Sequence, residues 1–98
     1  MKTRVQQEII FKVKTLREQH AISQATLAEI IDSKSSGLVG NIESKKFPQK
    51  YTLRQLKLIS DYFKVRYESF FMTDDELKKP KKEALAIFFK KVVEYVEP

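Results

Sequence analysis

The stretch "SQATLAEIIDSKSSGLVGNIESKK", residues 23–46, decides the fold of this chain. It starts as a helix with Ser23 as its N-cap, breaks at "DSK" (32–34), and restarts on two serines. Both glycines of the chain, Gly37 and Gly40, fall within the second of these two short helices. Glycine costs a helix interior roughly 1 kcal/mol relative to alanine. We therefore expect the bare backbone to allow close approach to another surface, either that of a binding partner or the neighbouring helix.

The composition favours one helical domain. The 98 residues are 42% apolar and 33% charged, and they include only two glycines and three prolines. Sheets need turns, and turns draw on glycine and proline, so this composition favours helices. The chain has no cysteine, which excludes disulfides and thiolate metal sites. No apolar run approaches the ~20 residues that cross a bilayer, and no signal-peptide pattern follows the N-terminus, so we expect a cytoplasmic protein without membrane contact.

Helical spacing of apolar residues predicts further helices on both sides of the opening stretch. Thr3 is the expected cap of a helix over 4–20, and Thr52 of a helix that ends near Phe63. Residues 65–71 are expected to form a short fifth helix. The polar segment 72–80 ends in proline and is predicted to be a linker. The expected core of the five-helix domain comprises Ile9, Leu16, Leu27, Ile31, Val39, Ile42, Leu56, Ile59 and Phe63, with Tyr62 also facing inward.

Residues 81–98 are predicted to form a strongly amphipathic C-terminal helix. Its apolar stripe needs a partner, because the domain over 4–71 already has its own core. The stripe can fold back into a groove beside the first helix, or it can meet a second copy. We favour the second copy, which makes the protein a homodimer and sets two third helices one DNA turn, about 34 Å, apart. The stripe comprises Leu85, Phe88, Phe89, Val92, Tyr95 and Val96.

The net positive charge of the chain favours nucleic acid as a binding partner. The formal net charge is +6, and the positive excess is concentrated in residues 1–20 and 41–60. Excess positive charge suits a phosphate backbone, although a solvated basic surface is the alternative. Two short helices joined by a three- or four-residue connector are typical of a helix-turn-helix unit, whose second helix enters the major groove.

Five segments in order resemble the XRE family, the phage-repressor and Cro-like helix-turn-helix domains: "SQATLAEI", "SSGLVGNIE", "NIESKK", "TLRQLKLISDYFKV" and "YESFF". The resemblance covers residues 11–71. It implies an all-α, five-helix, lambda-repressor-like domain that binds double-stranded DNA sequence-specifically and regulates transcription, as a repressor, through helix 35–44. The connector departs from the family pattern, which usually holds a glycine and an apolar residue where this chain has "DSK".

The candidate DNA contacts lie on or beside the third helix. Lysines suit phosphates, and the two serines can bond phosphate or base, although Ser35 is also a candidate cap. Asn41 suits adenine or phosphate, and Leu38 suits a thymine methyl or the core. Gln24 can meet a phosphate or steady a neighbouring side chain. The full predicted set is Gln24, Lys34, Ser35, Ser36, Gly37, Leu38, Asn41, Lys45 and Lys46.

Other functions are less favoured by the residues. Because DNA would repel a carboxylate, Glu43 is expected to pair with a basic residue. One histidine, no cysteine and no carboxylate pair in an apolar setting argue against an enzyme, and no phosphate loop or zinc spacing implies a cofactor. The adjacent acids at 74–76 are expected to be solvated. The alternative function is a protein-interaction module, such as an antitoxin that binds a toxin through residues 80–98.

Overall fold

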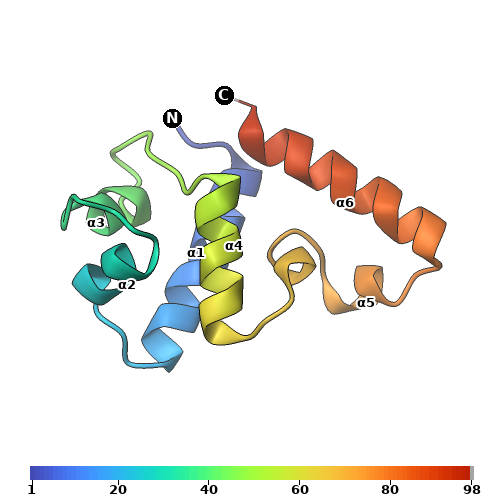
Figure 1. Ribbon diagram of the computed structural model, residues 1–98. Coiled ribbons are helices and arrows are strands. Elements are labelled where there is room, and N and C mark those ends of the chain that lie inside the picture. The colour runs from blue at the N-terminus through green and yellow to red at the C-terminus, as the bar shows by residue number, and fades with distance from the viewer. Residues whose placement is uncertain (98) are drawn as a thin grey trace.

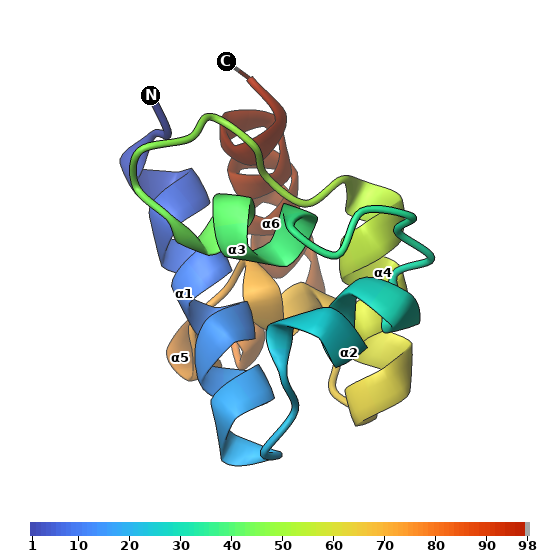
Figure 2. The ribbon, with the colours of Figure 1, turned by 90° about the vertical axis from the view of Figure 1, so that its left-hand side faces the viewer.

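The computed structural model describes residues 1–97, and every regular element in that range is helical. The helices α1 and α4 occupy the middle of the molecule (Figure 1). Helices α2 and α3 lie to one side of them, and α5 and α6 lie to the other, an arrangement that Figure 2 also shows. The predicted all-α class is confirmed. The elements are α1 (Arg4–Gln19), α2 (Gln24–Ile30), α3 (Leu38–Glu43), α4 (Leu53–Phe63), the 3₁₀ helix η1 (Tyr67–Phe70), α5 (Asp74–Leu77) and α6 (Lys81–Val96).

Hydroxyl side chains set where the helices begin. The predicted caps Thr3, Ser23 and Thr52 each accept a hydrogen bond from a backbone N–H in the first turn. Thr3 and Thr52 belong to full capping boxes, in which the glutamine three residues later bonds back to the cap. These signals are local in sequence, and the predicted starts of α1, α2 and α4 are confirmed.

Non-glycine residues end several helices. Ala21, Asp32 and Lys64 have φ values of 53°, 57° and 58°, in the left-handed region that glycine usually occupies. Asp32 follows α2. Its backbone N–H donates a hydrogen bond to Glu29 O, and the Ser33 N–H donates one to Ala28 O. Aspartate tolerates this conformation better than most residues. The connector after α2 therefore turns without the glycine that the family pattern would place there.

The third helix is shorter than predicted. It begins at Leu38, with Gly37 at the N-cap position, so the prediction that Ser35 caps it was wrong. The Ser33 hydroxyl accepts from the Ser35 N–H at 3.1 Å and donates to Ser35 O at 3.0 Å. A serine side chain that bonds its neighbouring backbone in this way offers an alternative to the helix. Only Gly40 therefore lies inside α3.

Two other predicted boundaries need correction. The expected fifth helix, 65–71, is a single 3₁₀ turn at Tyr67–Phe70. The expected linker, 72–80, holds the short helix α5, which begins with a capping box from Thr73. Acidic residues in the first turn of α5 favour it further, because they oppose the helix dipole. Met72 is buried, so this segment is part of the packed structure.

One apolar core runs through the described residues. All of the predicted core residues are buried, except Leu16, which is half-buried against the core. The prediction that Tyr62 faces inward was wrong, since its side chain is exposed and lies edge-on to the Phe63 ring. The core also holds buried residues that the sequence did not place there: Ile10, Val13, Ala28, Tyr51, Phe70, Phe71, Met72 and Tyr95.

The inner face of α6 packs on its own chain. Tyr95 is buried, and its hydroxyl donates to Tyr51 O at 2.6 Å. The Gln6 amide donates to Tyr95 O at 2.8 Å, which ties the end of α6 to α1. Ala84 and Phe88 also pack against the core. The fold-back alternative therefore accounts for this face, and a second copy is not needed to cover it.

The two buried tyrosines make a matched test of this docking. Burial raises the pKa of both Tyr51 and Tyr95, so both hydroxyls stay protonated. Tyr95→Phe leaves the buried Tyr51 carbonyl without its donor, and we expect a loss of about 1–3 kcal/mol in the free energy of unfolding. The Tyr51 hydroxyl has no hydrogen-bond partner within residues 1–97, so Tyr51→Phe should cost less than about 0.5 kcal/mol. Urea unfolding measures both, and equal losses would contradict the assigned bond.

Candidate nucleic-acid interface

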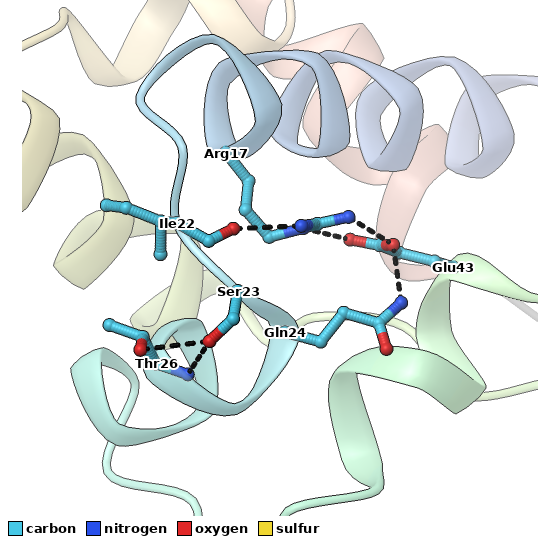
Figure 3. A network of polar contacts seen from close by, with 6 residues as sticks. All are labelled: Arg17, Ile22, Ser23, Gln24, Thr26 and Glu43. Atoms are coloured by element: carbon cyan, nitrogen blue, oxygen red, sulfur yellow. Dashed lines mark hydrogen bonds and ion pairs between the residues drawn. The ribbon is translucent and has the colours of Figure 1, made fainter.

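A buried ion pair joins α1 to the end of α3 (Figure 3). Arg17 Nε and Nη2 donate to the two carboxylate oxygens of Glu43 at 2.8 and 2.9 Å, in a bidentate arrangement. The side chains of Arg17 and Glu43 are only 11% and 5% exposed. Hydrogen bonding to Glu43 outweighs burial and raises the pKa of Arg17. The prediction that Glu43 pairs with a basic residue is confirmed.

Arg17 and Glu43 also form hydrogen bonds with the residues at which α2 begins. Arg17 Nη1 donates to Ile22 O at 2.9 Å, in the segment that leads into α2. The Gln24 side-chain amide donates to Glu43 Oε1 at 2.9 Å (Figure 3). Of the two roles predicted for Gln24, the structure shows the steadying of a neighbouring side chain. Arg17, Gln24 and Glu43 thus fix α1, α2 and α3 relative to one another through one carboxylate.

The glycines of the opening stretch differ in what surrounds them. A Cβ added at Gly40 would lie 3.3 Å from Gln24 Oε1, a tight contact between α3 and α2. The absence of a side chain at Gly40 therefore leaves room for the Gln24 side chain, which extends to Glu43. A Cβ at Gly37 would meet nothing within 4 Å, and the backbone there has an ordinary helical conformation. Helix packing explains Gly40, whereas no contact within residues 1–97 requires a glycine at position 37.

Lys2 supports the end of α3, a role that the sequence did not reveal. Its ammonium group donates to Ile42 O at 2.5 Å and to Ser44 O at 2.7 Å, at the C-terminal end of α3. A cation there neutralises carbonyls that have no partner inside the helix. Lys2 is buried, and this burial lowers its pKa. No local pattern indicates this role, because the accepting carbonyls lie 40 and 42 residues further along the chain.

The structure gathers the predicted contact residues on one side of the molecule. Figure 2 shows α3 between the turn that precedes it and the loop that follows it. The residues at 34–37 are exposed in the turn, Asn41 is half-exposed on α3, and Lys45 and Lys46 are exposed in the loop. Gln24 is exposed at the start of α2. Leu38 is half-buried and packs against the core, as expected for the core alternative.

This surface carries unpaired positive charge. Within the described part of the chain, Lys34, Lys45 and Lys46 form no ion pair. The nearby Asp32 lies 3.8 Å from Arg54, and both side chains are well exposed. Solvent-exposed pairs of this kind contribute little stability. The three lysines are thus free to meet an anionic surface.

The described residues offer little for other chemistries. No group of three histidines or acids that could hold a metal ion lies within 1–97. The acids at 74–76 form the first turn of α5, where Glu76 completes the capping box. None of the helices in the described range is both long and apolar enough to cross a bilayer.

Comparisons with protein-family models, curated proteins and solved structures found no match to this chain. The class of this protein is therefore described from its fold and its candidate site. The chain is a small all-helical protein in which two short helices, α2 and α3, meet around a buried Arg17–Glu43 pair beside unpaired lysines.

The ion pair gives a prediction about stability. Glu43→Gln leaves the Arg17 guanidinium buried and unpaired, and we expect a loss of about 3–5 kcal/mol in the free energy of unfolding. The double change Arg17→Met with Glu43→Leu should cost clearly less than the sum of the two single changes. The control is Asp61→Asn, which breaks the exposed pair with Lys57 and should cost at most about 1 kcal/mol. Urea unfolding measures Glu43→Gln, the two single changes, the double change and the control, and additive losses in the double change would show that the pair is not coupled.

Proposed function

We propose that this protein binds double-stranded DNA through α2, the turn and α3, and regulates transcription as a member of the XRE class. One observation carries the proposal: α2 and α3 are locked together by Arg17, Gln24 and Glu43, and the surface beside them carries exposed, unpaired lysines. The resemblance of residues 11–71 to the five-helix XRE domain supports the same function.

The lysines and the helix would contribute in different ways. Phosphate contacts position a protein on the duplex, and contacts to base edges select the sequence. Lys34, Lys45 and Lys46 flank α3 on both sides and suit phosphates. Asn41 is half-exposed, and its amide suits the donor and acceptor pair on an adenine edge. Because α3 spans only Leu38–Glu43, we expect few base contacts and a large phosphate share of the affinity.

The polar network beside α3 would keep the binding surface in one conformation. Its bonds join α1, α2 and α3, and the Arg17 and Glu43 side chains at its centre are largely covered from water. Lys2 holds the far end of α3 through its terminal carbonyls. A surface that is already ordered loses little conformational entropy on binding, which favours affinity. A rigid α3 also favours one register in the major groove.

A second candidate function has an observation of its own. Large apolar side chains are exposed along the outer face of α6, away from α2 and α3. An antitoxin or another interaction module would present such a face to a protein partner. A salt-dependent shift of duplex DNA separates a regulator from a pure interaction module, and selection of sites from a random DNA pool identifies the operator.

The lysine pair after α3 gives a prediction about salt. Replacing Lys45 and Lys46 together by glutamine should weaken binding to all DNA sequences alike. It should also reduce the slope of log affinity against log salt by about 1.8, since each phosphate contact contributes about 0.9. The matched control changes the exposed neighbours Lys78 and Lys79, which follow α5 on the other side of the molecule. Fluorescence anisotropy at several salt concentrations measures both, and equal slopes for the two variants would contradict the assigned surface.

Asn41 gives a prediction about sequence preference. Asn41→Ala should reduce discrimination between the selected site and a single-base variant by about 1–3 kcal/mol, while binding to unrelated DNA changes little. The Asn41 side chain makes no hydrogen bond within residues 1–97, so the fold should tolerate the change. Competition binding with a panel of site variants measures the effect. A uniform loss across the panel would instead assign Asn41 to a phosphate.

A further inference from the structure

One face of α1 is only partly covered where the helix passes the end of α3. Gln7, Ile10, Phe11 and Lys14 follow one another at spacings of three, one and three residues, so they lie on the same face of the helix. Ile10 is buried, Lys14 is half-buried, and the Phe11 side chain is 67% exposed. This face therefore offers an aromatic ring and an ammonium group within one helical turn of each other.

A hollow of about 270 Å³ lies between this face and the end of α3. Its opposite wall includes Ile42, Ser44 and Lys45, where the loop that leaves α3 runs beside the start of α1 (Figure 2). Lys2 fixes that wall, because its ammonium group donates to Ile42 O and Ser44 O. Sites for drug-sized ligands have volumes of roughly 300–1,000 Å³, so this hollow suits a smaller molecule of one or two rings.

Three lysines line the hollow. Lys14 and Lys45 form no ion pair within residues 1–97, so both ammonium groups are available to an anion. The donors of Lys2 are directed at backbone carbonyls at the end of α3, so Lys2 adds positive charge without a free donor. An anion in the hollow thus finds one cationic partner on α1 and another in the loop.

The acidic residues nearby do not cancel this charge. Glu43 also lines the hollow, but its carboxylate is already neutralised by the buried pair with Arg17. Glu8 forms its own ion pair at the start of α1 and lines a different hollow. Glu18 follows Lys14 by one turn, yet it does not line the hollow, and it forms no ion pair in the part of the chain that the structure describes. The hollow therefore keeps a net positive charge.

A second hollow shares Phe11 but has a different charge. Its volume is about 310 Å³, and it lies between α1 and the segment that contains η1. Its lining cation is Lys12, whose ammonium group already donates to the carbonyls of Ser69 and Phe70 at 3.3 Å. The contrast between a cation bonded to the chain and two unpaired cations selects the hollow beside α3 as the site for an anion.

We propose that the hollow beside α3 binds a small aromatic anion, a molecule of one or two rings that carries a carboxylate or a phosphate. The ring packs against Phe11, in the offset or edge-on arrangement that aromatic pairs prefer, and against the apolar side chains of Ile10 and Ile42. The anionic group lies between Lys14 and Lys45, which donate charge-assisted hydrogen bonds to it. An aliphatic anion lacks the first contact, and an uncharged ring lacks the second.

Binding of the anion has a consequence that rests on the proposed function. Lys45 belongs both to the hollow and to the proposed DNA-binding surface. A bound anion neutralises this lysine and sets a negative charge beside the path of the phosphates, so the anion and DNA oppose each other. Because linkage between two sites is reciprocal, each lowers the affinity for the other by the same factor.

The first test measures anion binding without DNA, so it does not depend on the proposed function. Benzoate, phenyl phosphate, benzamide and acetate are titrated into the full chain, and backbone amide shifts are followed by two-dimensional NMR. Benzoate or phenyl phosphate should shift the amides of Phe11, Lys14, Ser44 and Lys45, and the tighter of the two shows which anionic group the lysines select. Benzamide and acetate should bind at least about tenfold more weakly.

Two outcomes of this titration would overturn the site. If neither aromatic anion shifts the lining amides, or if benzamide binds as tightly as benzoate, the hollow does not select an aromatic anion. If the shifts are instead confined to Val65 and Ser69, the anion occupies the second hollow and the assignment beside α3 is wrong.

Matched variants test the two proposed contacts. Phe11→Ala should weaken binding of the tighter anion at least about tenfold, and Lys14→Gln should weaken it several-fold. The controls are Phe89→Ala and Lys90→Gln on α6, since Phe89 is 63% exposed and Lys90 is exposed, and both should leave binding unchanged. Circular dichroism should show the wild-type helix content in all four variants. Equal effects of the α1 and α6 changes would contradict the assigned contacts.

A last experiment tests the opposition between the anion and DNA. Fluorescence anisotropy measures DNA affinity in saturating benzoate or phenyl phosphate and in acetate at the same ionic strength, and the aromatic anion should lower the affinity several-fold. An unchanged affinity, in a chain that binds both ligands, would overturn the opposition and leave the site standing. A chain that binds the anion but no DNA would instead overturn the proposed function.

Discussion

The buried pair of Arg17 and Glu43 is the constraint on which the α2–α3 unit depends. Neither α2 nor α3 is long enough to be stable alone, since isolated helices shorter than about 12–15 residues are marginal in water. Both are held by tertiary contacts, and the carboxylate of Glu43 receives hydrogen bonds from α1 and from α2 at once. A charge in such a place is costly unless its partners are fixed, so the pair favours one arrangement of the three helices over others.

The remaining polar groups around α3 follow the same logic. Lys2 reaches the C-terminal carbonyls of α3, and Gln24 passes Gly40 to reach Glu43. Each of these contacts joins α3 to an element far away in the sequence. A helix of only six residues thus has its Glu43 side chain and its end carbonyls bonded by neighbours. On the proposed function, this is the property that a DNA-reading helix needs, because a fixed helix presents the same few side chains to every groove it enters.

Helix α6 carries apolar residues on a packed face and on an exposed face. Tyr95 and its neighbours complete the core of the domain, whereas Leu85, Phe89, Val93 and Val96 are exposed on the opposite face. The helix is therefore part of the domain.

Local patterns by themselves determined the helical class, the caps at Thr3, Ser23 and Thr52, and nearly all of the predicted core. Those features depend on residues within one or two turns of each other, so the sequence carries their signal directly. Only the tertiary structure decided the start of α3, the roles of Lys2 and Gln24, and the division of α6 into two faces. The Ser33 turn delays α3 by three residues relative to the predicted start at Ser35. The other contacts join groups 19 to 89 residues apart, and no periodicity in the chain encodes such distances.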